Sequence, residues 1–210
     1  MTWRLGDSLP QIKLAQWREE REFWLKRNPR PWDSETAKRY RKRFSGRIDN
    51  CLDQGSGSCI LRDPALSRIV ADALRFFDGQ RYELAAFVVM PNHVHVLFRP
   101  LGSHRLGNIL RSWKLFTARQ INRTTGRSGK LWEKDYWDRL IRDEMHFMKC
   151  LEYIRENPEK AELRDGEFLL FEKVQESRLA DRRPMRATRG GRKTAPAIGI
   201  CGTRPRSGSG

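Results

Sequence analysis

Apolar side chains recur every three or four residues along three stretches of the first 80 residues, which is the spacing of amphipathic helices. The stretches cover residues 14–25, 37–51 and 66–77, and each follows residues that can cap a helix. The first ends at the NPRPW sequence of residues 28–32 and the third at an Asp-Gly pair, both of which break helices. We therefore predict three helices in this part of the chain.

Short apolar runs replace the helical spacing after residue 82. Residues 85–90 (AAFVVM) are apolar, and residues 94–98 (VHVLF) alternate in character. Because Pro91-Asn92 lies between them, we predict two antiparallel strands joined by a tight turn. The remaining pattern predicts, in order, a helix over 106–121 that stops at Gly126, an extended aromatic-rich segment over 130–141, a helix that Asp143 caps and Asn157-Pro158 ends, and a short strand over 167–174.

The predicted order of helices and strands is that of an α+β protein built on one sheet. A chain of 210 residues with 38% hydrophobic residues fits one domain, or one domain with appendages, and can bury a core. No apolar run approaches the roughly 20 residues that cross a bilayer, and the first ten residues lack the apolar stretch of a signal peptide. We therefore expect a cytoplasmic protein with no membrane contact. The four cysteines lack CxxC spacing, which argues against a zinc ribbon and a disulfide scaffold.

The excess of positive charge indicates a polyanionic partner. The chain holds 42 Lys and Arg against 26 Asp and Glu, a formal charge of +16. Residues 182–210 carry eight of these cations and no acid, and their Gly and Pro content predicts a disordered basic tail over 181–210. Nucleic acid is the first partner class to consider. The tail by itself is equally compatible with a solubilising end and with non-specific attraction to phosphates.

Two of the four histidines stand as His93-Val94-His95 inside a predicted strand. Side chains two residues apart project from the same face, about 6 to 7 Å apart along the strand, which lets two neutral imidazoles bind one divalent cation. The flanking valines would anchor the other face in the core, beneath an exposed metal site. The alternative is a pair of half-buried histidines that are hydrogen-bonded on a sheet.

The last predicted helix offers further candidates. Tyr153 and Asn157 are four residues apart and share a helix face, away from the apolar stripe. Tyr153 could act as a nucleophile and Asn157 as an oxygen ligand to the same metal. The alternatives are a surface or packing tyrosine and an asparagine that ends the helix before Pro158.

Three strings of the sequence, read together, resemble those of a known family. They are VMPNHVHVL at residues 89–97, GKLW at 129–132 with YWDR at 136–139, and YIRENP at 153–158. Over roughly residues 60–165 the chain resembles the single-tyrosine transposases of the HUH superfamily, in particular the REP-associated tyrosine transposases (RAYT) of IS200-like type. The resemblance implies a ferredoxin-like fold, with helices on one side of a central antiparallel sheet.

The resemblance also implies an activity and its residues. His93 and His95 correspond to the pair that binds Mg²⁺ or Mn²⁺, Tyr153 to the nucleophile, and Asn157 to a polar third ligand. Such an enzyme cleaves and rejoins single-stranded DNA through a 5′-phosphotyrosine intermediate, and it acts on hairpins or repeat palindromes. It would work as a monomer or as a homodimer.

Recognition of single-stranded DNA would rest on cations and aromatic rings that alternate along residues 113–137, where rings can stack on bases. The alternative is a set of core aromatics beside a solvated basic face. The candidate contact residues are Lys114, Arg119, Arg123, Lys130, Trp132, Lys134 and Tyr136.

Departures from the family pattern set the expected domain boundaries. Residues 1–60 would hold a partial first strand plus a helical insertion, residues 61–180 the transposase core, and residues 181–210 the tail. Residues 2–5 look like the end of a strand that Met1 cuts short, which suggests a start codon further upstream or a truncated copy. The helices within residues 11–53 would serve as a lid or a DNA-backbone contact, or would simply pack.

Two other functions remain compatible with these residues. One is a non-catalytic nucleic-acid-binding remnant, in which the histidines are structural and positive charge provides the binding. The other is a metal-dependent phosphodiesterase that hydrolyses through bound water without a covalent intermediate. Replacing Tyr153 separates them, because only the transposase needs its hydroxyl as a nucleophile.

Overall fold

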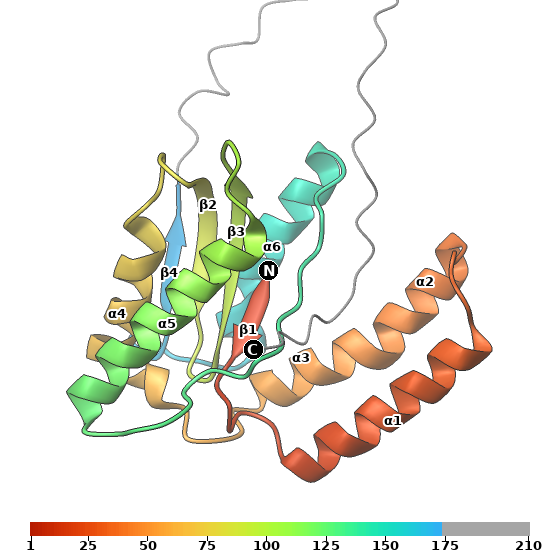
Figure 1. Ribbon diagram of the computed structural model, residues 1–210, viewed down its shortest axis with the longest axis horizontal. Coiled ribbons are helices and arrows are strands. Elements are labelled where there is room, and N and C mark those ends of the chain that lie inside the picture. Colours follow the sequence, from red (N-terminus) through yellow and green to blue (C-terminus); the bar gives the residue numbers. More distant parts are fainter. Residues whose placement is uncertain (174–210) are drawn as a thin grey trace, which may run out of the picture.

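The computed structural model describes residues 1–173, and the predicted basic tail over 181–210 lies outside these described residues (Figure 1). Across residues 1–173, no helix is both long and apolar enough to cross a membrane. The elements are, in chain order, β1 (Thr2–Arg4), α1 (Gln11–Arg27), α2 (Ser34–Tyr40), the π-helical turn η1 (Arg41–Ser45), α3 (Gly46–Asp53), the 3-10 turn η2 (Ile60–Arg62), α4 (Pro64–Arg75), β2 (Tyr82–Val89), β3 (His93–Pro100), α5 (Leu106–Thr125), α6 (Glu144–Lys160) and β4 (Leu169–Glu172).

The centre of the fold is a four-stranded antiparallel sheet in the order β1-β3-β2-β4. β2 and β3 form the predicted hairpin, with the Pro-Asn turn between them. The predicted extended segment runs along the free edge of β1, where Leu5 bridges Trp132 and Thr2 bridges Trp137. The α+β class with a central antiparallel sheet is therefore confirmed.

Alternation along β2 and β3 divides the apolar side chains between the two faces of the sheet. α4 and α5 cover one face, where Phe87, Val94 and Trp113 belong to the main core. α6 packs on the opposite face, where Leu97 and Ile154 belong to a second, smaller core. Figure 1 shows α4 and α5 in front of the sheet and α6 behind it. The predicted grouping of helices on one side holds for α4 and α5, and α6 adds a layer on the other side.

The N-terminal helices form a hairpin that projects from the sheet (Figure 1). α1 makes one leg, and α2, η1 and α3 follow one another as the other leg, so a π-helical turn interrupts the second predicted helix. Aromatic rings join the two legs: the Trp24 centroid lies 5.1 Å from Trp32, 5.2 Å from Tyr40 and 5.9 Å from Phe44. We call residues 11–53 the helical arm.

The last helix differs from its prediction at the C-terminal end. α6 continues through Pro158 to Lys160 instead of ending at Asn157. Proline has no amide hydrogen, so Pro158 cannot donate to the carbonyl of Ile154. In the last turn of a helix this one missing hydrogen bond is the main cost of a proline. The next turn still closes, because the amide of Ala161 donates to the carbonyl of Asn157 at 3.1 Å. The continuation keeps Asn157 inside the helix that covers the sheet.

Candidate functional site

β3 carries both candidate histidines on the sheet face that α6 covers. His93 and His95 lie on this face, while Val94 and Val96 belong to the main core on the other. The two Nε2 atoms are 2.9 Å apart, and the rings are nearly perpendicular with centroids 4.7 Å apart. The period of the strand thus brings two ring nitrogens to one point.

Asn92 sets the tautomer of His93. The side-chain Nδ2 of Asn92 donates to the backbone carbonyls of Leu52 and Ser56, at 3.1 and 3.0 Å. Its Oδ1 is therefore the atom that faces Nδ1 of His93, 2.7 Å away. Because an amide oxygen only accepts, Nδ1 carries the hydrogen and Nε2 keeps its lone pair.

Thr2 is the partner of His95. The pairing of β1 with β3 sets these two residues opposite each other, and Oγ1 of Thr2 lies 2.7 Å from Nδ1 of His95. Since Nε2 of His93 is an acceptor, the contact between the rings needs the hydrogen on Nε2 of His95, and the Thr2 hydroxyl then donates to Nδ1. A hydroxyl also accepts hydrogen bonds. Moving the hydrogen to Nδ1 would therefore expose two Nε2 lone pairs and keep the Thr2 contact.

Both rings are buried, with exposed fractions of 1% for His93 and 4% for His95. Burial lowers the pKa of His93 to about 3, and burial together with the neighbouring His93 lowers the pKa of His95 well below its ordinary value. Both rings are thus neutral at neutral pH. The prediction of an exposed site is wrong, because α6 covers this face of the sheet. A cavity of about 330 Å³ reaches His93 and is also lined by Asp53, Arg62 and Arg164.

α6 supplies the two other candidates. The half-buried ring of Tyr153 meets His95 edge to face, with centroids 5.2 Å apart. Asn157 is 1% exposed, and its Nδ2 donates to the carbonyl of Tyr153 at 2.9 Å. The nearby Asn157 side chain partly offsets the lowered pKa of His95. Since Nδ2 is engaged by Tyr153, Oδ1 is the atom of the Asn157 amide left to accept a hydrogen or bind a cation. The four predicted residues lie together between β3 and α6.

The two imidazoles and the Asn157 side chain fit a divalent metal ion whose coordination shell the protein fills only in part. Across residues 1–173, no three His, Cys, Asp or Glu side chains form a metal-binding group, so the two imidazoles need other donors. Their 2.9 Å separation is close to the roughly 3 Å between two nitrogens that each lie about 2.1 Å from one ion. Oδ1 of Asn157 provides a third donor, and water or phosphate would complete the shell. Neutral imidazoles with an amide oxygen suit Mn²⁺ better than Mg²⁺.

Comparison with known proteins finds a family that part of the chain resembles. Residues 61–157 match the family model described as "Transposase IS200 like". This part of the chain is similar to the IS200-like transposases. The match includes the histidine pair of β3 and reaches Tyr153 and Asn157 on α6.

The chain is also similar to a curated protein of Haemophilus influenzae whose name describes a putative REP-associated tyrosine transposase. The two are 28% identical over 89 residues, which are 38% of this chain and 51% of the relative. The chain thus spans about half the length of the curated relative that it matches. No solved structure matches it. The family match and the curated relative both point to a transposase-like function for residues 61–157.

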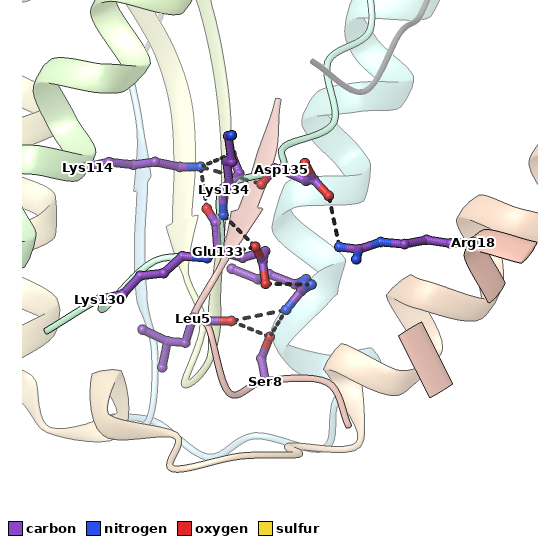
Figure 2. Close-up of polar contacts among 9 residues, drawn as sticks. Leu5, Ser8, Arg18, Lys114, Lys130, Glu133, Lys134 and Asp135 are labelled. Carbon is purple, nitrogen blue, oxygen red and sulfur yellow. Dashed lines mark hydrogen bonds and ion pairs between the residues drawn. The ribbon is translucent and has the colours of Figure 1, made fainter. Parts of the chain in front are cut away.

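Two of the predicted DNA-contact residues, Lys114 and Trp132, make their polar contacts within the protein. Nζ of Lys114 donates to the three consecutive backbone carbonyls of residues 133–135, at 2.8, 3.3 and 3.4 Å (Figure 2). Burial lowers the pKa of Lys114 to about 8. Trp132 is 4% exposed, and its Nε1 donates to Oγ1 of Thr117 at 2.8 Å. The prediction that these two side chains face DNA is therefore corrected, because both hold the extended segment against α5.

The other five candidates reach solvent at two separate places. Arg119 and Arg123 are exposed on α5, which covers the sheet face opposite the histidines. Lys130 and Lys134 are exposed on the extended segment, and Tyr136 is half-buried there. The α5 pair is thus not brought together with Tyr153, and a DNA role for these five residues stays a prediction.

Sequence reasoning missed the buried ion pair that fastens the extended segment to β1. Arg4 is 1% exposed, and its Nη2 lies 3.4 Å from a carboxylate oxygen of Glu133. The same carboxylate accepts from Nζ of Lys130 at 3.1 Å and from the backbone amide of Lys134 at 2.7 Å (Figure 2). The spacing of Thr2 and Arg4 along one strand was the available signal, since it puts both on the face that carries the histidines.

The lowered histidine pKa values predict that the metal-free protein loses stability in mild acid. The unfolded chain protonates His93 near pH 6.5, whereas the folded chain does so only near pH 3, so protons favour unfolding between these values. For His93 alone, the free energy of unfolding should fall by about 2 kcal/mol between pH 7.5 and 5. Urea denaturation in EDTA at several pH values measures this loss.

A matched pair of variants separates this effect from other titrating groups. His93→Asn should flatten the pH dependence by about 2 kcal/mol over the same range. His104→Asn, which replaces an exposed histidine, should leave the dependence unchanged. Equal pH dependence in the wild type and in His93→Asn would contradict the assignment of a buried, neutral His93.

Proposed function

We propose that the chain is a DNA-strand transferase that cleaves and rejoins single-stranded DNA through a 5′-phosphotyrosine formed on Tyr153. The observation that carries this proposal is the 5.2 Å edge-to-face contact between Tyr153 and His95, beside the paired Nε2 atoms. A potential nucleophile thus lies next to two neutral nitrogen donors. The IS200-like family match supports the same chemistry.

His93, His95 and Asn157 would hold a divalent metal ion, for which the donor set favours Mn²⁺ over Mg²⁺. When bound, such an ion neutralises and polarises the phosphate that is to be cleaved. The chain's own contribution is preorganisation, since Asn92 fixes the ring of His93, Thr2 that of His95, and α6 the Asn157 amide. The site therefore needs little rearrangement of these side chains when DNA arrives.

Tyr153 performs the covalent step. Its hydroxyl oxygen attacks the phosphorus in line, an O–P bond forms to Tyr153, and the bond from phosphorus to the 3′ oxygen breaks. The tyrosine proton passes to water or a neighbouring base, and the departing 3′ oxygen takes up a proton to become a free 3′-OH. Attack by another 3′-OH on the phosphotyrosine reverses these bond changes and rejoins the strand. No ATP is needed, because the number and type of ester bonds are conserved.

The proposed substrate is single-stranded DNA that carries a hairpin, such as a repeat palindrome. The basic composition and the exposed Lys130 and Lys134 support an interaction with phosphates.

Tyr153→Phe should abolish formation of a covalent protein–DNA adduct. The experiment mixes purified full-length protein with labelled single-stranded hairpins from its own flanking DNA and Mn²⁺, and then resolves adducts on a denaturing gel. Loss of one hydroxyl removes the nucleophile, while the ring and its packing stay in place. Tyr40→Phe is the matched control, because its ring lies in the helical arm, and it should keep the adduct.

Each other outcome of this experiment favours a different function. DNA cleavage without an adduct in the wild type would indicate a metal-dependent phosphodiesterase. Tight DNA binding with neither cleavage nor adduct, across all flanking hairpins, would indicate a non-catalytic remnant. An adduct that survives in Tyr153→Phe would contradict the assignment of the nucleophile.

Thr2→Val should weaken Mn²⁺ binding by about 10- to 100-fold, the usual effect of removing a hydrogen-bond partner from a metal-binding histidine. Valine keeps the shape and strand preference of threonine but cannot accept from Nδ1 of His95. Isothermal titration of Mn²⁺ without DNA measures the affinity, and Thr2→Ser should bind like the wild type. Equal affinities in Thr2→Val and Thr2→Ser would show that the hydroxyl has no part in metal binding.

A further inference from the structure

The helical arm concentrates positive charge at the end that lies away from the sheet. Residues 21–43 hold nine Lys and Arg against three acids. These residues form the C-terminal half of α1, the loop that follows it, and the start of the second leg, and Figure 1 shows them at the tip of the projection. Among its described residues, the arm approaches the paired histidines only at its C-terminal end, through the Leu52 carbonyl and the side of the cavity that Asp53 lines. The tip is therefore free for another task.

The cations at the tip stand on a rigid support. Trp32 and Tyr40 pack ring against ring at 4.7 Å, and both contact Trp24. Two arginines lie over aromatic faces, Arg27 at 4.2 Å from the Phe23 centroid and Arg30 at 4.6 Å from Trp32. Such contacts hold the guanidinium groups in place at the surface.

Three lysines of the tip are open to solvent. Within the described residues 1–173, Lys26, Lys38 and Lys42 are exposed and form no ion pair. Nearer to the sheet, Glu20 binds both Arg47 and Arg43, the last cation of the tip. The three tip lysines thus keep their charge free of any ion pair within the described residues.

We propose that the tip of the helical arm binds the phosphate backbone of the duplex stem in a DNA hairpin. This inference rests on the proposed function, and it assigns the stem to the arm and the single strand to the site at Tyr153. A fixed array of cations matches a stiff, regularly charged duplex. Single-strand binding instead uses rings that stack on bases, and here the rings of Trp24, Trp32 and Tyr40 are packed against one another.

An anionic membrane surface is the competing partner for a basic helical hairpin. A helix that lies in the lipid interface places large apolar residues along its outer face. Among the described arm residues, the large exposed hydrophobic side chains are Ile12 and Phe23, and the guanidinium of Arg27 covers the ring of Phe23. The arm therefore has the charge but not the apolar face that membrane binding needs.

The test removes five tip charges in the full-length protein, with glutamine at positions 26, 27, 38, 39 and 42. Fluorescence anisotropy compares a flanking-DNA hairpin with the same single strand lacking its stem, over a range of salt concentrations. The variant should bind the hairpin at least about tenfold more weakly than the wild type at low salt, and its log–log salt slope should be shallower by about 0.9 for each lost phosphate contact. Binding to the stemless strand should change little.

A matched control removes five exposed cations that are scattered outside the tip, with glutamine at positions 13, 68, 105, 142 and 149. This control should bind the hairpin much like the wild type. An equal loss in both variants would mean that net charge alone is responsible and would overturn the proposal. Unchanged hairpin binding in the tip variant would overturn it as well. Loss of binding to phosphatidylserine vesicles, with hairpin binding intact, would assign the arm to a membrane instead.

The folded state and the catalytic proposal are checked in the same samples. If circular dichroism shows that the variant with five substitutions melts at a lower temperature than the wild type, a triple variant replaces it. The triple variant carries Lys26→Gln, Lys38→Gln and Lys42→Gln, because these lysines make no ion pair within residues 1–173. It should still weaken hairpin binding and flatten the salt slope. The wild-type Tyr153 adduct on the hairpin strand reports on the proposed function alone. A normal adduct together with unaltered hairpin binding in the variant refutes only the proposed role of the arm, whereas a missing wild-type adduct refutes only the proposed chemistry.

Discussion

Two imidazoles are buried between a strand and a helix, and each of their four ring nitrogens has a polar partner. An unpaired buried polar atom would cost about 1–3 kcal/mol. The partners come from distant parts of the chain. Asn92 pairs with His93 and is itself held by carbonyls of residues 52 and 56, at the end of the helical arm. Thr2 of β1 pairs with His95, and Asn157 approaches it from α6. Strand, arm and helix are thus tied to one pair of rings.

β1 is short, and its position depends on a second polar contact. The guanidinium of Arg4 is buried against Glu133, whose segment is fastened to α5 by Lys114. Buried ion pairs add little net stability, but removing one partner is costly, so such pairs oppose alternative registers. A slip of β1 by one residue would turn both Thr2 and Arg4 to the opposite face. The Arg4–Glu133 pair therefore helps to keep the Thr2 hydroxyl opposite His95.

Local pattern was enough to predict most of the helices and the β2–β3 hairpin, because periodicity assigns side chains to faces. It also put His93 with His95, and Tyr153 with Asn157, on shared faces. It was not enough for contacts that depend on strand register or on depth. Of two aromatic residues in the same extended segment, Trp132 is core and Tyr136 is half-buried. Lys114 looks like any surface lysine until three carbonyls of the extended segment surround it. The burial of His93 likewise followed from how closely α6 packs, which no residue spacing reveals.

The most direct test of the account is a crystal structure of the full-length protein soaked in Mn²⁺, with anomalous diffraction recorded at the manganese edge. The account predicts a peak within ligand distance of Nε2 of both His93 and His95, with Oδ1 of Asn157 on the same ion. It also predicts that Thr2 remains hydrogen-bonded to Nδ1 of His95. A saturated crystal whose manganese peaks all lie away from these two nitrogens would contradict the claim that this buried pair is the metal centre.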